Sequence, residues 1–264
     1  MTMKRLLKRA LAFPTSFRRI KESFNEIEVE TISFCNRKCS YCPNISFDRV
    51  ESSGSVLMDD SVLDTIFVQL ESIGFKGIFS PHMYGEPLLD PRIVDIVKRI
   101  SDLGAIPKIV TNGDYLTPNL LQELLASGLK ILYISKHSPR LSSSAMNTLK
   151  YIEENHNPQL SFQVLDFYSD FKSERNMVGN RGGNLDIETT KKPPIMCPYV
   201  LYPVIDVNGV IVLCCQDFNS DYQLGKVTDR HIYEIWNDPM NVAMRRNVFK
   251  GKFDLSICQH CLMD

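Results

Sequence analysis

Three cysteines gathered in one short stretch are the first feature of the sequence that could do chemistry. Cys35, Cys39 and Cys42 form a C-x3-C-x2-C spacing directly after a run that is typical of a strand. Three thiolates this close in sequence can hold one metal centre. A closed 4Fe-4S cluster takes four cysteines, so three leave one iron open to an outside ligand, whereas zinc is more often held by paired C-x2-C knuckles. The spacing therefore predicts an iron–sulfur cluster with one open position.

Five further cysteines lie far along the chain and complete its total of 8. They are Cys197, Cys214, Cys215, Cys258 and Cys261. Because Lys8 and Arg9 interrupt the apolar residues near the start, we expect no signal peptide and a reducing cytosol, where clustered cysteines bind metal more often than they pair. Cys214 and Cys215 are neighbours in a predicted strand and point to opposite faces, so both cannot easily reach one metal centre.

The elements that would position these cysteines follow a repeated pattern of short apolar runs and amphipathic segments, which predicts an α/β fold with a parallel sheet. Two helices are well marked, one with Asp90 as N-cap and Pro91 at its first position, and one opened by Thr117 and Pro118. The candidate strands are 27–33, 77–82, 105–111, 130–135 and 160–167. Five such steps suit a partial barrel better than a complete eightfold one.

Composition and charge narrow the class of protein. The chain has 264 residues, 44% of them hydrophobic, and a net charge of −1, which fits a globular protein and gives no general field for nucleic acid. No window is apolar for the length of a membrane span. Residues 1–21 form a basic amphipathic segment, either packed on its own domain or lying on an anionic membrane at the inner surface of the cell. We expect a cytoplasmic protein.

The last part of the chain has a different character. After a polar connection over 169–196, two β-like runs, 199–206 and 210–215, meet at Asn208 and Gly209, a strong hairpin signal. Helices are expected near 232–236 and 240–249. The interpretation is a small metal-stapled extension, with boundaries at 1–25 for the arm, 26–190 for the partial barrel and 191–264 for the extension.

The first cluster resembles the defining motif of the radical S-adenosylmethionine (radical SAM) enzymes, in which an aromatic residue precedes the last cysteine, as Tyr41 does here. The resemblance implies a partial (β/α) barrel whose site lies at the carboxyl ends of the strands. It also implies that SAM binds the open iron and that one electron cleaves it to a 5′-deoxyadenosyl radical. This radical abstracts a hydrogen atom from the substrate.

Shorter motifs follow in the order of that family. Gly85, Glu86 and Pro87 come after the second predicted strand, where the family holds the SAM amino group. Asn112, in Thr-Asn-Gly, ends the third strand, and Ser135 ends the fourth, where a hydroxyl often lies near the SAM ribose or carboxylate. Each could instead be an ordinary turn or cap residue.

The second group of cysteines resembles the truncated, twitch form of the SPASM extension found on some radical SAM enzymes. By that resemblance Cys197, Cys214, Cys258 and Cys261 hold one auxiliary 4Fe-4S cluster, and Cys215 is left over. Four ligands leave no open iron, which suits electron transfer. A structural zinc ribbon is the alternative. Cys215 is either an inert small side chain or a hydrogen-atom donor to a substrate radical.

Four cationic or titratable residues are further candidates. Arg181 lies where related enzymes place an arginine in the active site, and its fork of donors suits a carboxylate or oxyanion, although a solvated loop arginine would look the same. His82, Lys136 and His137 lie at predicted strand ends. Any of these three could bind substrate or act as a general base, and the sequence does not choose between them.

Four functions remain open at this point. The leading one is oxidation of a sugar or cyclitol alcohol, with the auxiliary cluster as electron acceptor and a flavodoxin- or ferredoxin-type protein as electron donor. An epimerase would use Cys215 to return a hydrogen atom. A peptide-modifying SPASM maturase is a third hypothesis, and a non-enzymatic, zinc-stapled binding module is the fourth.

Overall fold

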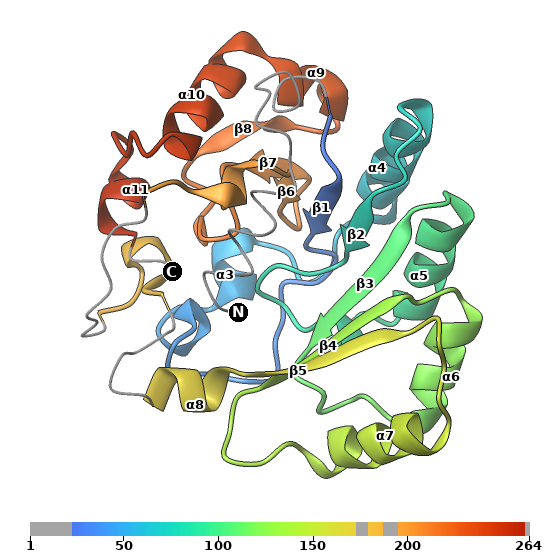
Figure 1. Cartoon of the computed structure of the whole chain (residues 1–264). Helices are drawn as coiled ribbons and strands as arrows, with labels where there is room; N and C mark the ends of the chain where they lie inside the picture. Colours follow the sequence, from blue (N-terminus) through green and yellow to red (C-terminus); the bar gives the residue numbers. More distant parts are fainter. Residues whose placement is uncertain (1–22, 173–178, 187–194, 262–264) are drawn as a thin grey trace.

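The computed structural model describes residues 23–172, 179–186 and 195–261, so the basic segment 1–21 lies outside the described residues. One mixed sheet organises the chain (Figure 1). Its eight strands run in the order β5-β4-β3-β2-β1-β6-β7-β8 and do not close into a full barrel. The predicted α/β class and open barrel are confirmed. Within the described ranges, no helix is long and apolar enough to cross a membrane.

The first five strands pair in parallel and belong to the β/α part of the chain. They are β1 (Glu26–Val29), β2 (Ile78–Ser80), β3 (Ile106–Thr111), β4 (Ile131–Lys136) and β5 (Ser161–Asp166). The helices between and after them are α3 (Arg49–Ser53), α4 (Asp60–Ser72), α5 (Ile93–Asp102), α6 (Pro118–Ala126), α7 (Ser143–Glu154) and α8 (Phe167–Lys172), with the 3-10 turns η1 (Pro43–Ile45) and η2 (Pro87–Leu89). All five predicted strands are present, each within a few residues of its expected bounds.

Helix starts follow the capping residues only in part. Thr117 is the N-cap of α6 and accepts a hydrogen bond from the Leu120 amide at 3.1 Å, as the sequence predicts. The predicted N-cap Asp90 is wrong, because α5 begins at Ile93. Asp90 instead ends η2 and binds the Arg92 amide and guanidinium. Its carboxylate is therefore used by an ion pair in place of a helix terminus.

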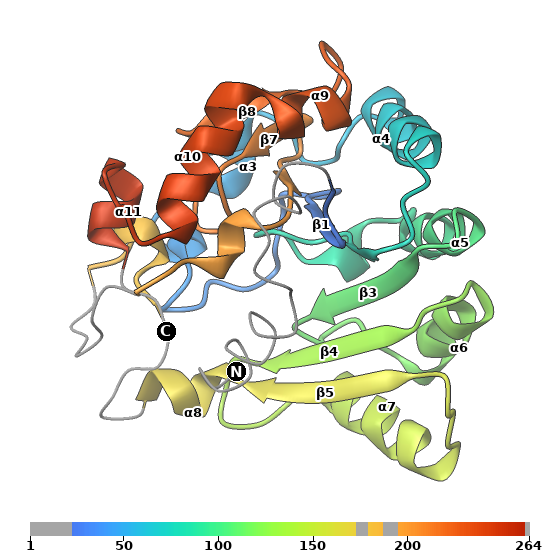
Figure 2. The same cartoon turned by 45° about the horizontal axis from the view of Figure 1, so that its top comes forward.

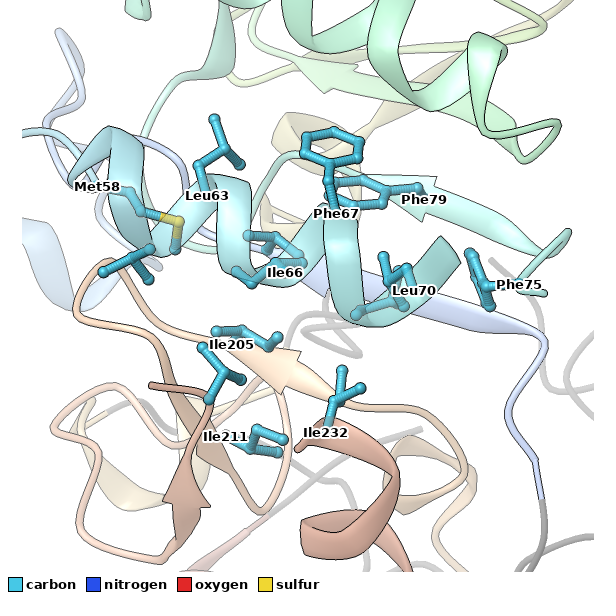
Figure 3. Close-up of a cluster of buried hydrophobic side chains, with 14 of the residues drawn as sticks. Met58, Leu63, Ile66, Phe67, Leu70, Phe75, Phe79, Ile205, Ile211 and Ile232 are labelled. Atoms are coloured by element: carbon cyan, nitrogen blue, oxygen red, sulfur yellow. The ribbon is translucent and has the colours of Figure 1, made fainter. Parts of the chain in front are cut away.

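The strands and helices share an apolar outer face. Ile27 and Val29 of β1 and Phe79 of β2 are fully buried against α4 and α5, and a second cluster fills the space between β3, β4 and α5 to α7. Figure 3 shows α4 lying over Ile205 and Ile211. The alternate strand positions point to the opposite, inner face, which carries the polar side chains. Figure 2 shows the carboxyl ends of β3 to β5 on the side away from α5 to α7.

The C-terminal part continues the same sheet. It contains η3 (Arg181–Gly183), η4 (Pro198–Val200), β6 (Val204–Ile205), β7 (Val210–Val212), β8 (Gln223–Lys226), α9 (Ile232–Asn237), α10 (Pro239–Phe249) and α11 (Ser256–His260). β6 pairs in parallel with β1 and antiparallel with β7. The predicted hairpin is confirmed, with Gly209 at φ 79° and Asp206 accepting from the Asn208 and Val210 amides at 2.9 Å. The extension is thus hydrogen-bonded to the first strand of the barrel.

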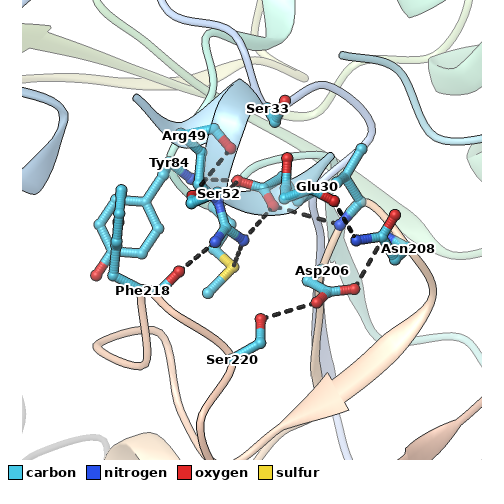
Figure 4. Close-up of polar contacts among 12 residues, drawn as sticks. Glu30, Ser33, Arg49, Ser52, Tyr84, Asp206, Asn208, Phe218 and Ser220 are labelled. Carbon is cyan, nitrogen blue, oxygen red and sulfur yellow. Dashed lines mark hydrogen bonds and ion pairs between the residues drawn. The ribbon is translucent and has the colours of Figure 1, made fainter. Parts of the chain in front are cut away.

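A buried ion pair joins the two parts (Figure 4). Arg49 of α3 binds the Glu30 carboxylate at 2.6 Å and 3.1 Å, and their side chains are 3% and 0% exposed. Burial by itself lowers the pKa of Arg49, but the attraction of Glu30 outweighs it and the pKa is raised. The guanidinium also donates to the Phe218 carbonyl, and Glu30 accepts from the Val207 amide at 3.3 Å. Glu30 and Arg49 therefore hold the C-terminal part against the barrel.

Arg49→Met should destabilise the protein by about 3–5 kcal/mol, because it leaves a buried carboxylate without its cation. Glu30→Gln/Arg49→Met should recover part of this loss, since an amide oxygen still accepts the backbone donors without carrying a charge. Equilibrium urea unfolding followed by circular dichroism measures both. Lys98→Met, which breaks an exposed pair with Asp102, is the matched control and should leave the midpoint almost unchanged. Equal effects of Arg49→Met and Lys98→Met would refute the structural role of the buried pair.

Candidate functional site: two groups of cysteines and the residues between them

The first three cysteines lie in the loop that leaves β1. Cys35, Cys39 and Cys42 are half-buried, and the loop is folded on itself by a bond from the Cys42 amide to the Cys39 carbonyl at 3.0 Å. The pKa of Cys35 is raised to about 12, by burial first and then by the charges of Glu86 and the nearby thiolates, and that of Cys39 is raised to about 11 by burial and by Cys42. Thiols that oppose one another's ionisation in this way are close neighbours, and they fit a cationic centre that removes the repulsion.

An ion pair that sequence reasoning missed fixes this loop to the end of β3. Arg37, inside the cysteine motif, binds Asp114 at 2.5 Å and 2.7 Å, and Asn36 donates to the same carboxylate at 2.8 Å. Asn112 reaches the loop as well, with its amide 2.9 Å from the Asn36 side chain and 4.0 Å from the Cys35 sulfur. The only signal for this pair was its position beside the motif, since opposite charges far apart in sequence rarely reveal their partner.

The Gly85–Glu86–Pro87 turn packs against the start of the same loop. A Cβ at Gly85 would lie 1.8 Å from the Ile32 carbonyl oxygen, so only glycine fits. The Glu86 carboxylate accepts from the Leu88 and Asn112 amides and from the Thr111 hydroxyl, at 2.6–3.1 Å. Burial raises the pKa of Glu86 to about 7, and these donors oppose that rise. The side chain is thus bound within the protein and ties β3 to this turn.

Tyr41 belongs to a stack of rings at the end of β4. It is 3% exposed, its hydroxyl lies 2.5 Å from Nδ1 of His137, and both rings pack against Phe167. Burial lowers the pKa of His137 to about 4, and so do nearby cations. Ser135, another predicted residue, is buried in β4 two positions before His137. The structure therefore brings Tyr41, Ser135 and His137 to one edge of the sheet.

The three candidate bases have different surroundings. Lys136 forms an ion pair with Asp166 at 2.6 Å, and His137 is bonded to Tyr41. His82 differs, because its buried Nδ1 has no hydrogen-bond partner among the described residues. Burial lowers the pKa of His82 to about 3, and so do the charges of Lys108 and other cations nearby. The His82 imidazole is therefore neutral, with an unused nitrogen.

The second group of cysteines surrounds one pocket in the C-terminal part. Cys197, Cys214, Cys258 and Cys261 all line it. Its other lining residues are Tyr199, Val200, Leu213, Gln216, Val248, Phe253 and Ile257. Burial and, to a smaller extent, the neighbouring thiolates together raise the pKa of Cys258 and Cys261 to about 12. Four thiols around an apolar pocket fit the donor set of a closed iron–sulfur cluster.

Cys215 lies on the other side of the chain from Cys214 and is absent from the pocket lining. Its sulfur accepts from the side-chain amide of Gln216 at 3.6 Å and from the Tyr202 hydroxyl at 4.0 Å. It packs against the same apolar cluster as Cys42. Burial raises the pKa of Cys215 to about 12, with a further contribution from the charge of Glu28. The thiol therefore stays protonated on the inner side of the sheet.

Arg181 lies between the two groups of cysteines. Its Nε donates to the Tyr41 carbonyl at 3.4 Å, inside the three-cysteine loop. Its charge lowers the pKa of Cys39 and Cys42 of that loop and of Cys261 in the second group. Its φ of 54° is in the left-handed region, which costs a non-glycine residue about 1–2 kcal/mol. Strain of this kind is concentrated at functional sites.

Among the residues of known position, no set of three or more histidine, cysteine, aspartate or glutamate side chains is gathered tightly enough to hold one metal ion.

Two families match this chain. Residues 29–192 match the Radical SAM superfamily, and residues 199–262 match the SPASM iron–sulfur cluster-binding domain. The S-adenosyl-L-methionine-dependent 2-deoxy-scyllo-inosamine dehydrogenase of Niallia circulans is 32% identical over 256 residues, which covers 90% of this chain and 92% of that protein.

Solved structures agree with these matches. The crystal structure of BtrN in complex with AdoMet and 2-DOIA superposes with a TM-score of 0.77 at 29% identity, covering 91% of this chain and 94% of that one. The structure of anSMEcpe with bound AdoMet has a TM-score of 0.54 at 15% identity and covers 85% of this chain and 80% of that one, a likeness of fold alone.

After anaerobic reconstitution, the intact protein should hold about eight irons per chain. Cys214→Ala and Cys258→Ala/Cys261→Ala should each hold about four, because each removes ligands of the pocket only. Cys215→Ala is the matched control and should keep about eight. Iron and sulfide analysis of the four proteins checks this assignment. A loss of iron in Cys215→Ala with no loss in Cys214→Ala would show that Cys215, and not Cys214, is the cluster ligand.

Proposed function

The chain belongs to the radical SAM superfamily and carries a SPASM iron–sulfur cluster-binding domain, and from this premise we propose that it oxidises an alcohol of a sugar or cyclitol to a ketone. Its cofactors are SAM, the 4Fe-4S cluster that binds SAM, and an auxiliary iron–sulfur cluster in the C-terminal part. The chain is a radical SAM oxidoreductase, so the non-enzymatic zinc-stapled module is set aside.

One observation carries the proposal. The three-cysteine loop and a separate four-cysteine pocket occur in a chain that resembles the Niallia circulans dehydrogenase over 90% of its length. Oxidation of a carbinol carbon removes a hydrogen atom, a proton and an electron. When bound, SAM and its cluster supply a 5′-deoxyadenosyl radical, and the second cluster supplies an acceptor for the electron. The residues of the inner face have to bind the alcohol and remove the proton.

Residues of the inner face offer hydrogen-bonding atoms that suit a hydroxyl-rich substrate. The Ser80 hydroxyl, His82 Nδ1 and the Tyr84 hydroxyl are buried, and within the described part of the chain none of these atoms has a hydrogen-bond partner. Unpaired buried polar atoms cost free energy, and a bound polyol would satisfy them. An apolar substrate would leave them unpaired, which supports a sugar or cyclitol.

His82 is our candidate for the group that removes the hydroxyl proton. Its ring is neutral and can accept at Nδ1, whereas His137 is bonded to Tyr41 and Lys136 to Asp166. The forked donors of the Arg181 guanidinium are better suited to hold the substrate oxygen as the negative charge on that oxygen grows. Tyr41, Gly85, Glu86, Pro87, Asn112 and Ser135 remain our candidates for shaping the SAM site.

An epimerase is the second candidate, and the position of Cys215 favours it. Its thiol is protonated, lies on the inner side of the sheet and packs against the same apolar cluster as Cys42. A sulfur–hydrogen bond in that place could return a hydrogen atom to a substrate radical. The same carbon would then be inverted with no net oxidation.

The electron donor and the cellular location are also part of the proposal. Reductive cleavage of SAM consumes an electron, so we infer a flavodoxin- or ferredoxin-type donor. We keep the cytoplasm as the expected location. Contact of residues 1–21 with an anionic membrane stays a prediction.

Incubation of the reconstituted protein with SAM, a reductant and 2-deoxy-scyllo-inosamine deuterated at its carbinol carbons should give 5′-deoxyadenosine carrying one deuterium, and an equal amount of ketone. Mass spectrometry measures both products. A panel of aminocyclitols and nucleotide sugars extends the search if this compound is not turned over. Cys39→Ala is the control without the SAM-binding cluster and should form neither product.

His82→Gln should lower the rate about 10²–10⁴-fold, the usual contribution of a general base, with 5′-deoxyadenosine no longer matched by ketone. Cys215→Ala should keep forming ketone at a similar rate. The same reaction with unlabelled substrate in deuterium oxide tests the alternative. If the native protein then gives an inverted alcohol that carries deuterium from the solvent, and Cys215→Ala does not, the protein is an epimerase and the dehydrogenase proposal is wrong.

A further inference from the structure

A short segment between the barrel and the C-terminal part has an unusual backbone. Arg181, Gly182 and Gly183 follow one another with φ of 54°, 67° and 91°, all left-handed. The turn is closed by bonds from the Gly183 and Leu185 amides to the Asn180 carbonyl, at 3.2 Å and 3.1 Å. Such a backbone persists only where its surroundings hold it.

One side of this segment is fixed to the four-cysteine pocket. The Asn180 side chain donates to the His260 carbonyl at 2.6 Å, and the backbone amide of Gly182 opposes the rise that burial causes in the pKa of Cys261. A Cβ at Gly183 would lie 2.8 Å from the Cβ of His260. The backbone of the segment thus lies directly on α11 and on a cysteine of the pocket.

The other side is fixed to the three-cysteine loop. Arg181 donates to the Tyr41 carbonyl at 3.4 Å, and Leu185 is buried against the Tyr41 ring with Cys39 beside it. Arg181 and Leu185 face the loop, whereas Asn180, Gly182 and Gly183 face α11 and the pocket. Residues 180–185 therefore contact both cysteine groups at once.

We propose that residues 180–185 are a positioning segment through which the four-cysteine site holds the Arg181 guanidinium beside the SAM-binding loop. The pocket fixes the backbone through Asn180, Gly182 and Gly183, and this left-handed backbone aims the Arg181 side chain at Tyr41. The second cluster site then has a role in assembling the first, in addition to electron transfer. The inference is independent of which alcohol is oxidised.

The position of Arg181 can be read from the reduction potential of the SAM-binding cluster. A cation beside the cluster ligands favours the reduced, more negative form, so losing it lowers the potential. The fall in potential measured for Arg181→Ala gives the full effect of losing the guanidinium. Asn180→Ala removes the bond to the His260 carbonyl, and Gly183→Ala adds a Cβ that pushes the segment away from His260. Both keep the guanidinium but disturb the packing on α11, so each should lower the potential by at least half as much.

The measurement is a redox titration followed by electron paramagnetic resonance, on proteins shown to hold about eight irons. The SAM-binding cluster is the one whose signal changes when SAM is added. Gly74→Ala is the matched control, because Gly74 is also left-handed, at φ 62°, but has nothing within 4 Å of its added Cβ. Its potential should equal that of the native protein.

The combined variant Asn180→Ala/Arg181→Ala gives the sharper outcome. If the segment acts by positioning Arg181, the potential should fall no further than in Arg181→Ala alone. Additive shifts, or unchanged potentials in Asn180→Ala and Gly183→Ala, would overturn the proposal. So would an unchanged potential in Arg181→Ala, because the guanidinium would then not lie near the cluster. None of these outcomes depends on turnover, so they are separate from a failure of the proposed dehydrogenation.

Discussion

The buried Glu30–Arg49 pair is the interaction on which the relation between the two parts of this protein depends (Figure 4). Glu30 follows β1, Arg49 begins α3 just after the cysteine loop, and both contact backbone groups of the C-terminal part. Two opposite charges removed from water stabilise each other, because a buried charge without its partner costs much more free energy. The pair therefore permits few relative positions of the loop and the C-terminal part.

Two cysteine sites of different character result from this arrangement. The first is a half-buried loop at the carboxyl edge of the parallel strands, and the second is an apolar pocket closed by η4, α10 and α11. Arg181 lies between them with its charge near thiols of both. An electron removed from a substrate on the inner face would thus have the radical-generating site on one side and an acceptor on the other.

Features that depend on neighbours in sequence could be predicted well. The spacing of Cys35, Cys39 and Cys42 indicated one centre, Thr117 and Pro118 started a helix, and Asn208–Gly209 formed a hairpin. The opposite faces of Cys214 and Cys215 followed from the period of a strand. Asp90 was misassigned because α5 begins three residues later, at Ile93, and the carboxylate expected to cap a helix is instead bound by the amide and guanidinium of Arg92.

The sequence by itself therefore determined the α/β class, the family and the grouping of the cysteines, because these arise from periodicity and short spacings. Only the tertiary structure decided which charges and rings meet across the fold. It paired Arg37 with Asp114, bonded His137 to Tyr41, left Nδ1 of His82 with no hydrogen-bond partner among the described residues, and bonded Asn180, next to Arg181, to α11. These contacts join residues far apart in the chain, and the packing that selects one partner among many is a property of the whole sheet and its helices.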